Sequence, residues 1–260
     1  MSMNDPKKVQ EMYINSDTLS TRINLHEKYS VNKYGWSNWV FDQYKFSEND
    51  NILELGCGTG GAWLGRDAHI PQDAKIILTD ISALMVQKAK ANLGANKHFS
   101  FQVMDVQNIA FDDGYFDIII ANHMLYHVPN ISKALAEIKR VLKNNGCFYT
   151  STIGLNHLKE LGDIYRLYEG KAQFGYSNEV IFNLDNGEKI LNEYFGAVVK
   201  RLYMDSLAVT DIHDLMDYII SYNDIPQSIY DEIYGKIAKE IKAKGAMNIS
   251  KDSGMFVCRP

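Results

Sequence analysis

One stretch of the chain decides its fold: Asn51-Ile-Leu-Glu-Leu-Gly-Cys-Gly-Thr-Gly-Gly61. It begins as a short apolar run typical of a buried strand and continues into three alternating glycines, Gly56, Gly58 and Gly60. Glycine lets the backbone turn tightly and approach a ligand with no Cβ in between, while N–H groups at a helix start point outward. The stretch therefore predicts a strand, a ligand-binding loop and the opening of a helix.

The glycine spacing is compatible with two kinds of ligand. Gly56, Gly58 and Gly61 satisfy G-x-G-x-x-G, the fingerprint of dinucleotide binding. Gly56, Gly58 and Gly60 equally satisfy G-x-G-x-G with an acidic residue, Glu54, two places upstream. The glycines alone leave both interpretations open.

Outward from this loop, short apolar runs alternate with helical patterns as far as residue 152. A helix over Ile131–Leu142 has one apolar stripe, with Asn130 placed to cap it and Gly146 to end it. The predicted strands cover residues 51–55, 75–79, 100–104, 116–121 and 147–151. Apolar strands joined by crossover helices predict a doubly wound α/β parallel sheet, in which ligands bind beyond the carboxyl ends of the strands.

The flanking regions are predicted to be mostly helical. Before the sheet, helices are expected over 6–14 and 18–29, with a third opening at Ser37; His157–Tyr168 reads as a helix after it. A capping-box pattern, Asp185-Asn-Gly-Glu188, predicts a helix ending near Phe195. Further helices are expected over 211–222 and 226–244, and two closing strands over 197–203 and 254–259.

No internal repeat or linker divides the chain, which predicts one domain over residues 1–260. Within it we expect an N-terminal helical lid (1–48), a ligand-binding core (49–152) and a substrate-selecting part with the closing strands (153–260).

Composition excludes several classes of function. Twenty-seven basic against 32 acidic residues give a net charge of −5, which offers no strong field for a nucleic-acid backbone. The three cysteines are scattered, against a disulfide framework or a zinc knuckle. No apolar signal core or membrane-length run occurs, so we expect a cytoplasmic protein that acts on neither membranes nor nucleic acids.

The residues after the other strands decide between the two ligands. Asp80 closes Leu78-Thr-Asp, Asp105 follows the third strand in Met104-Asp-Val, and Asn122-His-Met-Leu-Tyr-His127 follows the fourth. With Ile52–Gly60, this order resembles the class I S-adenosylmethionine-dependent methyltransferases, in particular those that modify small molecules. The resemblance, carried by residues 50–152, implies a Rossmann-like seven-stranded sheet, mostly parallel with the last strand antiparallel, under an N-terminal helical lid and with helical insertions.

The resemblance also implies roles for single residues. Asp80 would bind the ribose hydroxyls and Asp105 the adenine amino group, while Tyr29 would reach the cofactor from the lid. The full expected cofactor set is Glu54, Gly56, Cys57, Gly58, Gly60, Asp80, Ile81, Met85, Asp105, Val106, Asn122 and Tyr29. His123, Tyr126 and His127 would face the acceptor. The two histidines are four apart on an expected helix start, but no Glu follows His123, so no metal site is predicted.

We therefore expect an enzyme that transfers a methyl group from S-adenosyl-L-methionine to N or O of a small molecule and releases S-adenosyl-L-homocysteine. An activated donor needs alignment and exclusion of water rather than a catalytic triad. The protein is expected to act as a monomer or homodimer. Two alternatives stay open: a protein that binds S-adenosylmethionine without catalysis, and an NAD-dependent oxidoreductase.

Overall fold

The computed structural model describes residues 16–168, 173–174, 181–221 and 223–260. Within them, seven strands form one sheet in the order β3-β2-β1-β4-β5-β9-β7. The strands are β1 (Asn51–Leu55), β2 (Lys75–Asp80), β3 (Phe99–Val103), β4 (Phe116–Asn122), β5 (Leu142–Ile153), β7 (Ala197–Val209) and β9 (Met247–Arg259). Neighbours from β3 to β5 pair in parallel, and β9 runs antiparallel to both β5 and β7. The predicted sheet, with its last strand antiparallel, is confirmed.

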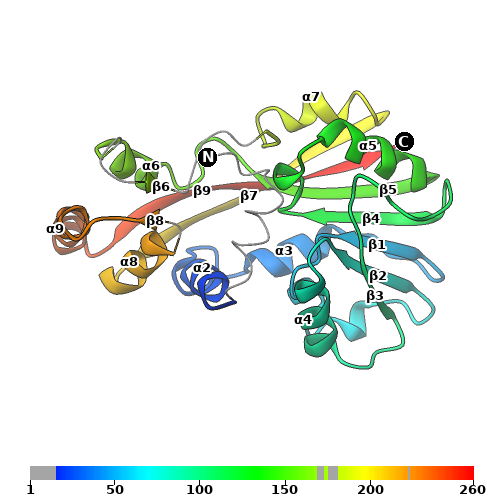
Figure 1. Ribbon diagram of the computed structural model, residues 1–260, viewed down its shortest axis with the longest axis horizontal. Coiled ribbons are helices and arrows are strands. Elements are labelled where there is room, and N and C mark those ends of the chain that lie inside the picture. The colour runs from blue at the N-terminus through cyan, green and yellow to red at the C-terminus, as the bar shows by residue number, and fades with distance from the viewer. Residues whose placement is uncertain (1–15, 169–172, 175–180, 222) are drawn as a thin grey trace.

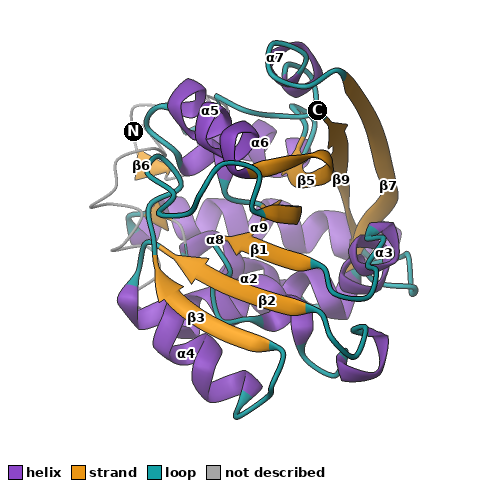
Figure 2. Ribbon diagram, turned by 90° about the vertical axis from the view of Figure 1, so that its right-hand side faces the viewer, coloured by secondary structure: helices purple, strands orange, loops and turns teal. Residues whose placement is uncertain are grey.

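Helices cover both faces of the sheet (Figures 1 and 2). One face packs against α5 (Ile131–Val141) and α7 (Gly187–Leu191), and the other against α3 (Trp36–Gln43) and α4 (Ala83–Leu93). Neighbouring residues of β1 enter opposite cores, Ile52 on the α3 side and Leu53 on the α5 side. This burial on both faces explains why the strands are apolar throughout.

The strands β7 and β9 are much longer than expected, because each continues past the sheet into a second layer of helices (Figure 1). Their register runs unbroken from Ala197 opposite Arg259 to Val209 opposite Met247. The far half of this strand pair carries Leu207, Val209 and Ile249 into a separate apolar cluster. That cluster belongs to a helical lobe built from α2 (Ser16–Tyr29), α6 (Lys159–Arg166), α8 (Ile212–Ile220) and α9 (Gln227–Lys244). A two-residue ladder joins β6 (Gln173–Phe174) to β8 (Asn223–Asp224).

The sequence predicts that a helix opens after the glycine run, and this prediction was wrong for an α-helix. The glycine run leads into two single turns of 3-10 helix, η1 (Gly61–Trp63) and η2 (Asp67–His69). Gly65 has a φ of +70° and Pro71 follows shortly, so the intervening residues cannot continue as a regular helix.

Three other local predictions were wrong. Helix α5 ends at Val141, and Gly146 lies inside β5, where an added Cβ would come within 2.9 Å of the Asp117 carbonyl oxygen. Asp185 does not cap α7, because its carboxylate accepts from the Leu155 N–H instead. His123 and His127 do not share a helix face, since only Leu125–His127 forms a 3-10 turn, η3.

Asn130 does cap α5, accepting from the Lys133 N–H at 3.0 Å, as predicted. The helix expected over 6–14 lies outside the described residues. Among the helices that are described, none combines the length and apolar character needed to cross a bilayer.

Candidate active site

The carboxyl ends of β1, β2 and β3 meet through three hydrogen bonds. The Cys57 N–H donates to the Thr79 carbonyl at 2.8 Å, so the glycine loop lies against the end of β2. The Gly58 N–H donates to Asp80 Oδ2 at 3.0 Å. The Met104 N–H donates to the Asp80 carbonyl at 3.0 Å, which brings the residue before Asp105 to the same edge. The loop, Asp80 and the start of the Asp105 turn therefore lie together.

Each alternating glycine of the loop has a positive φ, which side-chain-bearing residues rarely adopt: +67° at Gly56, +55° at Gly58 and +76° at Gly60. Their surroundings differ. A Cβ on Gly56 would lie 2.9 Å from Met124 Cβ, and one on Gly60 would lie 2.9 Å from Leu93 Cδ1. Among the described residues, none has an atom within 4 Å of a Cβ placed on Gly58. Gly58 is thus the glycine whose face is open toward a ligand.

The Asp80 carboxylate shapes this loop. Besides Gly58, it accepts from the Ser82 N–H at 2.8 Å through Oδ1. Burial raises the pKa of Asp80, and its two backbone hydrogen bonds oppose that rise. Capping of α4 is done by Ser82, whose hydroxyl accepts from the Met85 N–H, so Asp80 does not act as the helix cap.

The side chains around Asp80 and Asp105 form a partly apolar border. Asp105 accepts from the N–H of Gln107 at 2.9 Å and from its side-chain amide. Met85 and Val106 are buried, whereas Ile81 is 40% exposed. This border combines exposed apolar surface, which can pack against a planar base, with a carboxylate that can accept hydrogen bonds from ribose hydroxyls.

Glu54 is buried beneath the loop and accepts from Trp63 Nε1 at 2.6 Å. Burial raises its pKa to about 7, although the bonds from Trp63 and Asn122 act in the opposite direction. Burial, with Glu54 next, also raises the pKa of the Cys57 thiol, which keeps it protonated at neutral pH. Cys57 is therefore no nucleophile and contributes its backbone to the loop.

Asn122, at the end of β4, has two further partners besides Glu54. Its side-chain amide donates to Tyr44 Oη at 2.7 Å and its Oδ1 accepts from Ser151 Oγ at 3.1 Å. Tyr44, directly after α3, is buried. Sequence analysis missed Tyr44, because residues so far apart in the chain show no joint pattern until the sheet brings them together.

His123 has a φ of +48°, a strained conformation for a residue that bears a side chain. Its N–H donates to the Ser151 carbonyl at 3.1 Å, and its ring centroid lies 5.0 Å from that of Trp36. Burial first, then the charges of Lys251 and His127, lower its pKa to about 4. The Tyr126 ring lies between the two histidines, 6.4 Å from His123 and 4.5 Å from His127.

Comparison with known proteins identifies this architecture. The family model described as "Methyltransferase domain" matches residues 53–150, which include the glycine loop and the ends of β1 to β4. Residues 53–150 of this chain thus match a methyltransferase domain, a match that covers less than half of the chain.

Curated relatives match this chain over about half of its length. It is 28% identical over 145 residues to a malonyl-[acyl-carrier protein] O-methyltransferase of Legionella pneumophila, covering 55% of this chain and 49% of that protein. It is 30% identical over 146 residues to a ubiquinone/menaquinone biosynthesis C-methyltransferase of Geotalea daltonii, covering 54% and 60%. The chain thus spans less than two thirds of the curated relatives it matches.

Solved structures share the fold at low identity. A putative methyltransferase from an antibiotic biosynthesis pathway of Anabaena variabilis superposes with a TM-score of 0.62 at 16% identity, covering 86% of this chain and 96% of that one. Phosphoethanolamine N-methyltransferase 2 of Haemonchus contortus superposes with a TM-score of 0.61 at 14% identity, covering 100% and 60%.

The topology of the sheet argues against the NAD-dependent alternative. A dinucleotide-binding sheet has six parallel strands and a helix N-terminus at its glycine loop. Here β9 inserts antiparallel between β5 and β7, and the loop opens only a 3-10 turn.

Tyr29 lies elsewhere than the prediction placed it. Its side chain belongs to the core of the helical lobe with Leu25 and Leu215, and its hydroxyl donates to Asp214 Oδ2 at 2.6 Å. The N-terminal segment divides here, because α2 joins the lobe whereas α3 covers the sheet. The aromatic residues that reach the end of β4 come from α3 and its C-terminal flank, not from Tyr29.

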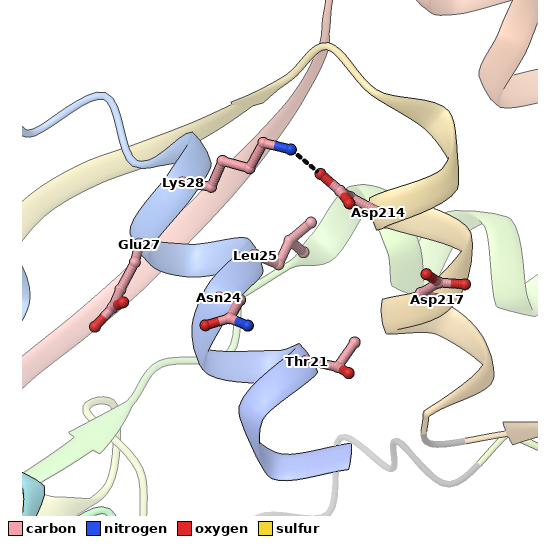
Figure 3. Close-up of a pocket in the computed structure, with 7 residues that line it drawn as sticks. All are labelled: Thr21, Asn24, Leu25, Glu27, Lys28, Asp214 and Asp217. Atoms are coloured by element: carbon pink, nitrogen blue, oxygen red, sulfur yellow. Dashed lines mark hydrogen bonds and ion pairs between the residues drawn. The ribbon is translucent and has the colours of Figure 1, made fainter. Parts of the chain in front are cut away.

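A cavity of about 630 Å³ lies between α2 and α8, away from the glycine loop (Figure 3). The ion pair between Lys28 and Asp214 spans it at 2.5 Å. Its lining residues are Thr21, Asn24, Leu25, Glu27, Lys28, Asp214 and Asp217. Most of these side chains are polar and belong to the lobe's outer helices, so we do not assign this cavity to the methyltransferase site.

Proposed function

We propose that the protein is an enzyme that binds S-adenosyl-L-methionine at the glycine loop and transfers its methyl group to N or O of a small-molecule acceptor. The observation that carries the proposal is the hydrogen bond between the Gly58 N–H and the Asp80 carboxylate, beside a glycine face open to a ligand. The methyltransferase family match over residues 53–150 supports it.

The residues at this edge fit the cofactor. Asp80 would accept from the ribose hydroxyls, and Asp105 would accept from the adenine amino group. Ile81, Met85 and Val106 would border the base. The backbone of Gly56, Cys57, Gly58 and Gly60 would approach the remainder, while Glu54 and Asn122 would hold the loop and the end of β4 from behind through Trp63 and Tyr44.

S-adenosyl-L-methionine supplies an electrophilic methyl group, and S-adenosyl-L-homocysteine is its product. The protein's own residues then have to position the acceptor and exclude water. Trp36 and Tyr126 flank His123 at the end of β4, which makes this the acceptor side. His123 is neutral at physiological pH, so its ring can accept a hydrogen bond that a hydroxyl or ammonium group of the methyl-accepting substrate donates. His127, beside Tyr126, would line the same side.

The atom that receives the methyl group is a separate part of the proposal. The relatives' names cover both O- and C-methylation, so methylation of carbon is an outcome that the experiment has to distinguish. We further propose that the protein acts in the cytoplasm, as a monomer or homodimer, on a substrate that is neither nucleic acid nor membrane lipid.

Calorimetry with S-adenosyl-L-methionine, S-adenosyl-L-homocysteine and NAD tests the cofactor. We expect both adenosyl compounds to bind and NAD to give no heat. Transfer of isotope-labelled methyl to a small-molecule extract, followed by mass spectrometry of the labelled product, tests catalysis and identifies the methylated atom. Binding without transfer would favour a non-catalytic S-adenosylmethionine-binding protein, and binding of NAD alone would overturn the proposal.

A further inference from the structure

Three histidines from distant parts of the chain gather where the helical lobe meets the ends of β4 and β5. His26 lies on α2, His123 follows β4, and His157 lies between β5 and α6. The His26 and His157 rings are stacked, with centroids 6.0 Å apart and planes at 21°. His123 is close enough for its charge to act on both of the others. We call these three residues the histidine cluster.

The histidine cluster retains capacity to bind. His26 Nδ1 is buried and has no hydrogen-bond partner among the described residues. His157 Nδ1 accepts from the Asp252 N–H at 3.3 Å and lies 3.4 Å from Ser253 Oγ. Each of the three histidines nevertheless keeps part of its surface accessible. We call the partly accessible region around their rings the recess. A buried nitrogen without a partner costs free energy that a ligand's polar group would recover.

A buried ion pair lies beside the recess. Lys251 on β9 pairs with Asp205 on β7 at 2.6 Å, and their side chains are only 6% and 0% exposed. Asp205 also accepts from Ser30 Oγ and from the N–H groups of Asn32 and Ser206, so its charge is shared among four donors. The Lys251 charge contributes to lowering the pKa of all three histidines, after burial as the main cause in each.

Aromatic rings close one side of the recess. Trp36 lies 5.0 Å from His123 and 5.4 Å from Tyr203, measured between ring centroids. Lys251 Nζ lies 5.6 Å above the Tyr203 ring. Neutral imidazoles, a buried lysine and an apolar wall suit a small molecule that has an oxyanion at one end, because imidazole N–H and ammonium groups donate to oxyanions.

We propose that the histidine cluster and Lys251 bind a carboxylate or phosphate group of the methyl acceptor, so that the substrate is an anionic small molecule. The inference rests on the proposed function, because it assigns the acceptor end of that same site. His26 and His157 would be specificity-determining residues supplied by segments outside the matched methyltransferase domain.

The test uses imidazole NMR of the full chain saturated with S-adenosyl-L-homocysteine, titrated separately with inorganic phosphate, acetate and tetramethylammonium. We expect one or both anions to shift the His26, His123 and His157 signals, and the cation to leave them in place. A response to phosphate alone would indicate a phosphate-bearing acceptor, and a response to acetate alone a carboxylate.

Two variants connect the response to the recess. His26→Phe keeps the ring shape but removes both nitrogens, and Lys251→Met combined with Asp205→Asn removes both charges of the ion pair. Each is expected to weaken anion binding by about tenfold or more. His213→Phe, which changes an exposed histidine of α8, is the matched control and should bind the anion normally.

Either of two results would overturn the inference: no shift at the three histidines with either anion, or shifts that persist unweakened in both variants. Failure of S-adenosyl-L-homocysteine to bind would count against the proposed function instead. In that event the same anion titration of the cofactor-free chain still decides whether the recess binds oxyanions.

Discussion

Asp80 and Gly58 illustrate how one hydrogen bond can define a binding loop. The Asp80 carboxylate accepts from the Gly58 N–H through Oδ2 and from the Ser82 N–H through Oδ1. These two bonds couple the glycine loop to the start of α4. Gly58 needs its positive φ, but nothing in the protein crowds the position where a side chain would begin. At the residue scale, backbone conformation and ligand space are therefore separable requirements.

Gly58→Ala and Gly114→Ala test this separation. Both glycines have a positive φ, +55° and +62°, and an added Cβ meets nothing within 4 Å at either. We expect each substitution to lower the free energy of unfolding by a similar amount, about 1–2 kcal/mol, because both force alanine into the left-handed region. Only Gly58→Ala should also abolish binding of S-adenosyl-L-homocysteine.

Urea denaturation and calorimetry of the two variants measure these effects. Normal binding by Gly58→Ala would show that the open face of Gly58 does not border the ligand. Loss of binding in both variants would point to a general loss of structure instead.

The long antiparallel pair of β7 and β9 joins the sheet to the helical lobe. One end of the pair lies in the sheet and packs against α7, and the other end supports α2, α6 and α9. Gly254, near the middle of β9, allows close approach, since a Cβ there would lie 2.4 Å from the Arg201 carbonyl oxygen. Close pairing of β7 with β9 therefore positions the helical lobe next to the ends of β4 and β5.

Two glycine-to-alanine substitutions should have opposite effects at this scale. Gly254→Ala should destabilise the protein by about 1–3 kcal/mol, because β7 must move away from β9. Gly235→Ala, at an exposed interior position of α9 with no neighbour within 4 Å, should stabilise it by about 0.5–1 kcal/mol. Thermal and urea unfolding measure both, and a stabilising Gly254→Ala would refute the close contact.

At the scale of the whole molecule, ionisable side chains are buried within the sheet and where the sheet meets the helical lobe. Burial lowers the pKa of His26 to about 3 and of His123 to about 4, and lowers that of His157 well below its usual value. Burial beneath the glycine loop raises the pKa of Glu54 to about 7. Burial thus keeps the three histidines and, in part, Glu54 uncharged at neutral pH.

These shifts predict that stability falls as the pH drops from about 6.5 toward 4. In that range the unfolded chain protonates the three histidines and the folded protein does not, which favours unfolding. Glu54 acts the other way, because the folded protein holds a proton that the unfolded chain releases above its ordinary pKa. Three histidines outweigh one glutamate, and each uncompensated histidine contributes up to about 1.4 kcal/mol per pH unit.

Urea denaturation at several pH values measures this slope. His26→Phe should reduce it by up to about 1.4 kcal/mol per pH unit, whereas His213→Phe should leave it unchanged. An unaltered slope in His26→Phe would show that His26 is not held neutral by the fold.

Much of this protein could be predicted without coordinates, because local physics determined it. Apolar runs that alternate with helical segments predict inner strands, and the alternating glycines after Leu55 predict a tight loop. Asp80, Asp105 and Asn122 followed from the rule that ligands bind beyond the strand ends. The inner strands and the position of Asn130 as a cap came from such short-range patterns, whereas the seven-stranded sheet with its antiparallel last strand was implied by the resemblance to a methyltransferase family.

Tertiary structure alone decided the rest, because it depends on contacts between residues that no local pattern connects. The extension of β7 and β9 past the sheet, the bond from Asn122 to Tyr44 and the departure of Tyr29 into the lobe all depend on long-range packing. So does the histidine cluster, whose members are unremarkable singly and acquire low pKa values only where α2, β4 and the chain after β5 meet. Sequence carries the proposed cofactor side of the site, since neighbouring strand ends suffice for it, whereas the proposed acceptor side depends on packing of the helical lobe against the sheet.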